Sequence, residues 1–141
     1  MPGLVLKTGD LAFFDPEFDG AMVTAPPGVL IGTGLANIEL MPVCVEGDQE
    51  TVIVPCVYLA DGFETPGAGL CMILELGPDQ IAETTQSEDL PVLLEGSVFE
   101  AIMQVIVPCT QIDGPVVIPD PVPEYPGEGF FVTTNIFVEA S

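Results

Sequence analysis

The side chains best able to do chemistry in this chain are its carboxylates and its four cysteines, because histidine is absent. Without an imidazole, Ser-His-Asp and Cys-His catalysis and His-based metal triads are unavailable. The cysteines form no Cys-x-x-Cys pair, so the usual spacing of a zinc knuckle or ribbon is missing. These absences remove most hydrolase mechanisms and the commonest structural zinc motifs.

Three interpretations of the cysteines remain. Buried free thiols are favoured, because each cysteine lies in or beside an apolar run and the chain is expected to stay in the reducing cytoplasm. A Cys₄ site that holds zinc or iron is the second, and one or two disulfides are the third. The candidate metal ligands are Cys44, Cys56, Cys71 and Cys109.

Neighbouring acids offer a second possible chemistry. Asp15 with Glu17, or Glu88 with Asp89, could supply the acid and base of a glycosidase-type reaction. The turns at residues 15–19 and 46–50 could offer oxygen ligands to calcium, but neither has the spacing of a calcium-binding loop. With 22 Asp and Glu in 141 residues, adjacent pairs are expected by chance. We therefore predict a solvated acidic surface and no enzymatic activity.

The charge balance restricts the possible partners. Against its 22 acids the chain has one cation, Lys7, which gives a formal net charge of −21. Nucleic-acid binding is excluded as a function, because neutralising phosphates requires clustered Lys or Arg. Anionic membrane surfaces and copies of the same chain should be repelled, whereas a basic or cation-bridged partner should be attracted.

No membrane or export segment is expected. The stretch Met1–Asp10 holds one cation and no apolar core, so it does not resemble a secretory signal, and we expect the chain to be made in the cytoplasm. The uncharged stretch at residues 20–38 is interrupted by proline and glycine. We therefore predict no stable membrane anchoring.

Fifteen glycines and fifteen prolines leave few windows long enough for a helix. Turn signals separate short runs rich in Val, Ile, Leu and Phe, which is typical of an all-β protein. Only Pro78–Ser87 could hold a turn or two of helix. The predicted strands cover residues 29–31, 37–45, 50–58, 70–76, 92–94, 98–107, 116–118 and 130–138.

Two further expectations concern these strands. The long apolar runs at 50–58 and 98–107 suggest strands that are covered on both faces, with Pro55 and Pro108 ending their pairing. The proline-rich segment at 114–129 predicts an extended polyproline arm that wraps over the body before the last strand.

The sequence also repeats itself. The pentapeptide Val-Ile-Val-Pro-Cys occurs at residues 52–56 and again at 105–109, and an aliphatic pair before a Gly-Thr or Gly-Ser step occurs at 30–33 and 93–97. Two related β-units are the simplest explanation, and coincidence in a Val-rich chain is the alternative. We expect the units to form a compact prism or barrel of short strands.

The arrangement of a Gly-Thr/Ser step, an apolar run, Met41-Pro42-Val43-Cys44 and Gly47-Asp48, followed by a second unit from Gly96-Ser97 to Pro108-Cys109, resembles the PAAR-like proteins of contractile injection systems. The resemblance covers residues 28–112. It implies a small cone of short strands that sharpens the tip of the particle, sits as a monomer on a trimeric β-helical spike and can carry effector cargo.

The chain departs from that family's pattern. The Pro-Ala-Ala-Arg motif is absent, and so are the histidines that usually join a cysteine to hold zinc. The resemblance therefore implies that any metal would be held by cysteines alone. Cys44 and Cys109 match the ends of the two units, and Cys56 and Cys71 are an extrapolation.

We thus predict one β domain over residues 1–141, with a PAAR-like core at 28–112 and a proline-rich arm and final strand at 113–141. As a structural tip protein it would cap a spike in an assembled particle and help to pierce a target envelope. The alternative is a homotrimeric capsid decoration or tail-fibre module, which self-association would reveal. A small carboxylate-dependent enzyme is the third hypothesis.

Overall fold

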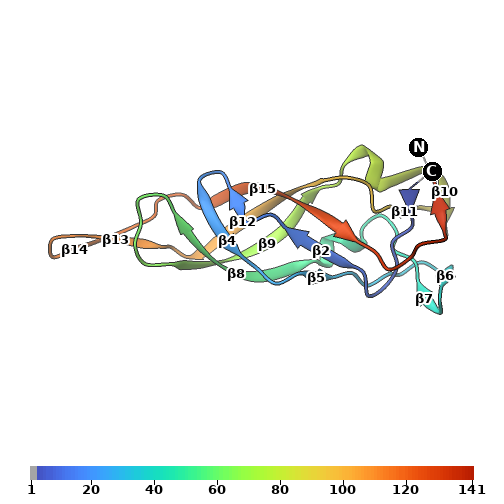
Figure 1. Ribbon diagram of the computed structural model, residues 1–141, viewed down its shortest axis with the longest axis horizontal. Coiled ribbons are helices and arrows are strands. Elements are labelled where there is room, and N and C mark those ends of the chain that lie inside the picture. The colour runs from blue at the N-terminus through green and yellow to red at the C-terminus, as the bar shows by residue number, and fades with distance from the viewer. Residues whose placement is uncertain (1–2) are drawn as a thin grey trace.

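The protein is elongated and built almost entirely of strands (Figure 1). The computed structural model describes residues 3–141, so Met1 and Pro2 of the predicted N-terminal stretch lie outside it. Its only helical turns in that range are two short 3₁₀ helices, Asp48–Thr51 and Pro78–Gln80. No helix of the described part is long and apolar enough to cross a membrane. The prediction of an all-β protein is confirmed.

One eight-stranded antiparallel sheet forms the body. It curls around the core like a half-barrel, and its long strands run roughly along the long axis of the molecule (Figure 1). In spatial order the strands are β3 (Glu17–Phe18), β4 (Ala21–Thr24), β8 (Ile53–Ala60), β9 (Gly67–Glu75), β12 (Phe99–Val107), β15 (Glu124–Val132), β2 (Leu11–Phe14) and β5 (Gly28–Val29).

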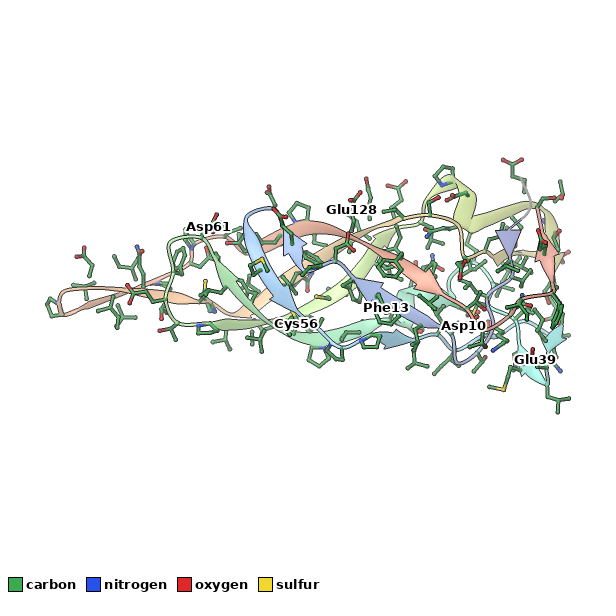
Figure 2. The ribbon with its side chains drawn as sticks, in the orientation of Figure 1. Asp10, Phe13, Glu39, Cys56, Asp61 and Glu128 are labelled. Atoms are coloured by element: carbon green, nitrogen blue, oxygen red, sulfur yellow. The ribbon has the colours of Figure 1, made fainter. Side chains whose placement is uncertain are left out.

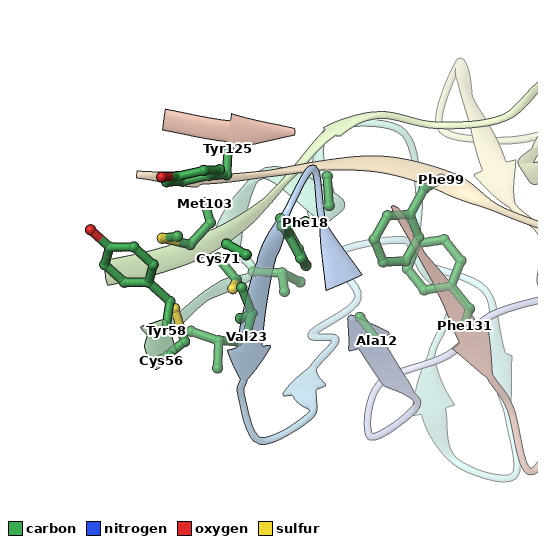
Figure 3. Close-up of a cluster of buried hydrophobic side chains, with 14 of the residues drawn as sticks. Ala12, Phe18, Val23, Cys56, Tyr58, Cys71, Phe99, Met103, Tyr125 and Phe131 are labelled. Atoms are coloured by element: carbon green, nitrogen blue, oxygen red, sulfur yellow. The ribbon is translucent and has the colours of Figure 1, made fainter. Parts of the chain in front are cut away.

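The sheet buries its concave face only. Along β8 exposed and buried residues alternate, with Val54, Cys56 and Tyr58 turned inward. The prediction that strands β8 and β12 are covered on both faces is therefore wrong. Their outward apolar side chains stay exposed, because no second layer packs against that side. The inward side chains form one continuous core that includes Phe18, Tyr58, Phe99, Met103, Tyr125 and Phe131 (Figure 3).

Three two-stranded sheets make one end of the molecule, which we call the broad end (Figure 1). A second, smaller core lies among them, formed by Val5, Ile38, Val43, Val45, Ala82, Val92 and Leu94. The helix expected at Pro78–Ser87 is limited to one 3₁₀ turn that Pro78 opens, and the rest is a strand. The paired strands are β1 (Gly3–Leu4) with β16 (Glu139–Ala140), β6 (Asn37–Ile38) with β7 (Met41–Pro42), and β10 (Ile81–Ser87) with β11 (Leu90–Leu93).

The opposite end narrows to a single hairpin, β13 (Thr110–Asp113) and β14 (Val116–Pro119), which we call the narrow-end hairpin (Figure 1). The structure therefore corrects the prediction of a polyproline arm over 114–129: this segment supplies β14 and most of β15. Pro126 is tolerated in β15 because it lies opposite Ile102 of β12, while pairing with β2 begins only at Gly129. A proline with one neighbouring strand need not donate to a second ladder.

The same rule explains the two repeated prolines. Pro108 follows the last residue of β12, as predicted. Pro55 lies inside β8, contrary to the prediction, because β4 pairs with β8 only from Val57 onward and leaves Pro55 a single partner strand.

Both copies of the repeated pentapeptide flank β9. Cys56 of the first copy and Val105 of the second lie opposite the same residue, Gly69, on its two sides. The copies therefore occupy parallel strands that are shifted along β9, and only Cys109 of the second copy is buried as deeply as its counterpart. Gly69 itself is required by close packing, since a Cβ there would lie 2.5 Å from the backbone carbonyl oxygen of Gln104.

Candidate functional site

The structure places the four predicted metal ligands in three separate regions, all as buried free thiols. Cys56 and Cys71 lie beside each other on β8 and β9 (Figure 3). Cys44 lies near Asp48 and Asp10 at the broad end; burial, followed by these two carboxylates, raises its pKa to about 12. Burial also raises the pKa of Cys71. Within residues 3–141 no three Cys, Asp or Glu side chains are arranged to hold a metal ion.

The central acid of the predicted calcium turn at 46–50, Asp48, has a structural role instead. Asp48 is buried, and its carboxylate accepts hydrogen bonds from the backbone N–H of Thr33 at 3.0 Å, from the Thr33 hydroxyl at 2.8 Å and from the N–H of Val45 at 2.8 Å. Because these donors occupy its oxygens, Asp48 fixes the loop around Thr33 to the start of the 3₁₀ helix.

The other acidic candidates stay on the surface. Asp15, Glu17 and Asp19 line an open groove of about 670 Å³ together with Glu128, and no basic side chain lines it. Figure 2 shows carboxylates, among them Glu128 and Asp61, that project from the flanks of the body. Glu88 and Asp89 form the turn between β10 and β11 instead. These positions match a solvated acidic surface.

The narrow end is shaped by its turn. Gly114 and Pro115 connect β13 to β14, and Gly114 adopts φ 64°, a left-handed conformation that glycine accepts without steric cost. The hairpin extends beyond the body, and in the part of the chain that the structure describes its one further pairing is a bridge from Thr110 to Thr65. Three of its apolar side chains are more than half exposed, namely Ile112, Val116 and Val117.

A buried carboxylate fixes the root of this hairpin. Asp120 Oδ2 accepts hydrogen bonds from the hydroxyls of Tyr58 at 2.9 Å and Tyr125 at 2.7 Å, and its Oδ1 accepts the N–H of Val122 at 3.0 Å. The N–H of Cys109 donates to Tyr58 Oη at 3.0 Å, and the N–H of Asp120 donates to the Cys109 carbonyl at 2.8 Å. We call Tyr58, Cys109, Asp120 and Tyr125 the hairpin anchor.

The electrostatics of the hairpin anchor follow from its donors. Burial alone would raise the pKa of Asp120, but the hydrogen bonds from Tyr125, Val122 and Tyr58 outweigh it and lower that pKa. Burial, together with the hydrogen bond to Asp120, raises the pKa of both tyrosines. The anchor therefore holds an ionised carboxylate between neutral phenols.

Sequence reasoning missed the hairpin anchor. Its members come from β8, the link between β12 and β13, the link after β14, and β15, so no single local pattern joins them. One signal was present: the chain has two tyrosines only, and buried tyrosine hydroxyls need a partner. Asp120, alone between two prolines, is that partner.

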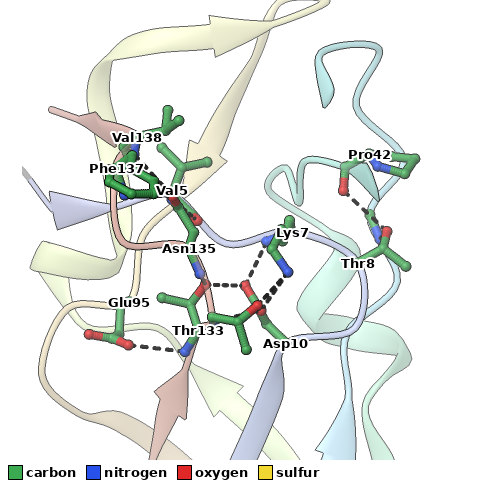
Figure 4. Close-up of polar contacts among 12 residues, drawn as sticks. Val5, Lys7, Thr8, Asp10, Pro42, Glu95, Thr133, Asn135, Phe137 and Val138 are labelled. Atoms are coloured by element: carbon green, nitrogen blue, oxygen red, sulfur yellow. Dashed lines mark hydrogen bonds and ion pairs between the residues drawn. The ribbon is translucent and has the colours of Figure 1, made fainter. Parts of the chain in front are cut away.

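A second polar cluster closes the broad end (Figure 4). Lys7 Nζ lies 3.5 Å from Asp10 Oδ1 and donates to Thr134 Oγ1 at 2.7 Å, while the Thr133 hydroxyl donates to Asp10. Asn135 donates to the carbonyls of Val5 and Val138. This broad-end lock, formed by Lys7, Asp10, Thr133, Thr134 and Asn135, joins the first strands to the last segment.

The surface of the broad end carries unusually exposed apolar side chains. Leu40 is 91% exposed in the turn between β6 and β7, and Phe137 is 80% exposed near β16. Glu39 and Leu40 have φ 52° and 69°, a left-handed conformation that costs non-glycine residues about 1–2 kcal/mol each. A two-residue hairpin turn requires this conformation at both central residues, and here it presents a leucine to solvent.

Comparison with known protein families identifies the family of the chain. A family model described as "contractile injection system spike tip protein" matches residues 1–141. The chain belongs to this family. The resemblance to a spike-tip protein is therefore confirmed, and the match extends over the whole chain. No curated protein matches this spike tip protein.

Membership in the family indicates the assembly to which the protein belongs. As a spike tip protein it is part of an assembled injection particle, where it associates with the spike or baseplate. The family match favours this function over the capsid decoration or tail-fibre module.

Proposed function

We propose that the protein caps and sharpens the spike as a structural element without catalysis. Its broad end sits on the end of a trimeric spike, and the narrow-end hairpin points away from the particle and meets the target envelope first. The observation that carries this proposal is the taper from three small sheets at one end to one hairpin at the other (Figure 1).

The broad end is suited to a protein contact. Leu40 and Phe137 are apolar and almost fully exposed, and full burial of such a side chain contributes about 1.5–3 kcal/mol. The backbone of the Glu39–Leu40 turn is already in the conformation that projects the leucine, so little ordering remains to be done on binding. The broad end also carries acids on several of its elements, which favour a partner with basic groups at its rim: Glu39, Glu88, Asp89 and Glu139.

The body is suited to transmitting force along its axis. Strands β9, β12 and β15 pair over most of their length, and their inward side chains form one packed core (Figure 3). Among the described residues, no buried side-chain polar atom lacks a hydrogen-bond partner. A body of this kind resists shear, because sliding one strand breaks many hydrogen bonds together.

The test is assembly of particles with altered tips. Leu40→Glu should remove the protein from purified particles, because it places a charge at the centre of the proposed contact. Met22→Glu is the matched control, since Met22 is 61% exposed on β4 of the body and should be incorporated normally. Normal incorporation of the Leu40→Glu protein would contradict the proposal.

Native mass spectrometry tests the stoichiometry. One copy of the tip should bind per spike trimer. In purified particles that lack the tip, any effector cargo should be missing as well. A stable homotrimer of the isolated chain without affinity for the spike would contradict the capping function.

A further inference from the structure

The narrow-end hairpin exposes apolar side chains on both of its faces. Opposite residues of an antiparallel pair share a face, so Ile112 and Val117 lie on one face, and Val116 lies on the other beside Asp113. Val117 is 60% exposed and Val116 54%. A hairpin that docks on a flat protein surface would need apolar side chains on one face only, whereas this hairpin exposes them on two.

The hairpin is also poor in charge. Residues 101–112 and 114–119 contain no charged side chain, in a chain with 22 acids. Asp113 is the one charged residue of the hairpin, and Asp120 at its root is buried. The narrow end is therefore complementary to an uncharged surface, and unlike the acidic flanks it offers little to a basic partner.

We propose that the narrow-end hairpin inserts shallowly into the interfacial region of a zwitterionic lipid bilayer. A surrounding medium can cover both apolar faces at once, which a single protein surface cannot. A second copy of the chain is a poor occupant, because two chains of net charge −21 repel each other. The same repulsion disfavours anionic lipids. The inference rests on the proposed function only in that the narrow end points outward.

The backbone sets the depth of insertion. Thr110 at the root of the hairpin bridges to Thr65, but within residues 3–141 no other segment forms a strand beside the two hairpin strands. Beyond Thr110 their outer N–H and C=O groups therefore need water, and an open edge is not stable in the hydrocarbon centre. Four residues per strand give a length of about 13 Å at the usual rise. That length is comparable with the depth of about 5–10 Å that amphipathic elements reach at the headgroup boundary. The side chains can thus be buried while the edges stay hydrated.

Tryptophan fluorescence can test this directly, because the chain contains no tryptophan. Val117→Trp and Val116→Trp each place one reporter on one face of the hairpin. Phe137→Trp is the matched control at the broad end, since Phe137 is exposed as well. Each full-length variant is mixed with phosphatidylcholine vesicles, and the emission maximum and the access of a water-soluble quencher are measured.

We expect a blue shift and reduced quenching for both hairpin variants and no change for Phe137→Trp. Adding Ile112→Thr to Val117→Trp should lower partitioning into the vesicles about tenfold, because it replaces an apolar group that would be buried in the bilayer by a hydroxyl. Vesicles that contain phosphatidylglycerol should bind less protein.

Three outcomes would overturn the inference: no shift at either hairpin position, a shift on one face alone, or an equal shift for Phe137→Trp. Circular dichroism checks that each variant folds. Ile112→Trp, which shares a face with Val117, replaces Val117→Trp if that variant does not fold. A negative result leaves incorporation into particles untouched, so failure here is distinguishable from failure of the capping function.

Discussion

Both ends of the molecule are held by a buried aspartate, but the two aspartates have different partners. At the broad end Asp10 pairs with Lys7, the one cation of the chain. At the narrow end Asp120 is held by the neutral hydroxyls of Tyr58 and Tyr125. The comparison shows that a strongly acidic chain can use a buried carboxylate to hold segments together without a counter-charge, provided that neutral hydrogen-bond donors surround it.

The largest effect is expected at the broad end. Lys7→Met should lower the free energy of unfolding by about 3–5 kcal/mol, because it leaves the buried Asp10 carboxylate without its counter-charge. Urea denaturation measures this. Adding Asp10→Asn should recover part of the loss, since the buried charge is then gone. A loss of less than about 1 kcal/mol would mean that the threonines and the backbone N–H of residue 7 hold Asp10 without the lysine charge.

At the narrow end, Asp120→Asn should cost about 2 kcal/mol, within the usual range for hydrogen bonds to a charged group. Because the pKa of Asp120 is lowered in the folded state, its contribution is fully present above the unfolded value of about 3.9 and is lost as pH falls through the lower folded value. The stability difference between wild type and variant should therefore be constant near neutral pH and shrink below about pH 4.

Urea denaturation at a series of pH values checks this prediction. Asp61→Asn serves as control, because Asp61 is an exposed acid near the same end (Figure 2). A difference that grows in acid would show that Asp120 is not the ionised group.

Smaller and opposite effects are expected at the two left-handed turns. Leu40→Gly should raise the stability of the isolated chain by about 0.5 kcal/mol, because relief of the strained conformation outweighs the added chain entropy. It should also weaken binding to the spike. Gly114→Ala should lower stability by about 1 kcal/mol, because alanine is strained at φ 64°. Thermal unfolding compares the two, and a loss of stability in Leu40→Gly would show that the leucine stabilises the fold.

The smallest effect is expected for the reactivity of the four thiols, which should not differ between the two ends of the molecule. Burial raises the pKa of Cys44 and Cys71, so alkylation of the folded protein at neutral pH should be slow, and all four thiols should react together on unfolding. Mass spectrometry of the alkylated chain checks this. Release of stoichiometric zinc or iron during unfolding would instead support a metal site.

The sequence was sufficient for the class of fold because glycine and proline exclude helices wherever they are frequent. It was insufficient for the proline-rich segment, since Pro126 and Pro55 are tolerated by the absence of a second neighbouring strand, which is a property of the assembled sheet. The hairpin anchor was missed for a related reason: Tyr58 meets Asp120 only after β8 and the link behind β14 have been brought together. Membership in the spike-tip family was predicted by resemblance of the repeated units, while the two ends to which we assign the function lie largely in turns and short hairpins.

The buried position of Lys7 has a consequence for proteolysis. Proteases that cleave after lysine or arginine find a single such bond in the chain, and its side chain lies inside the broad-end lock. The folded protein should therefore persist in trypsin-rich surroundings. Cleavage at Lys7 would report the opening of the broad end alone. The amount of this one proteolytic fragment therefore measures how often the broad-end lock opens.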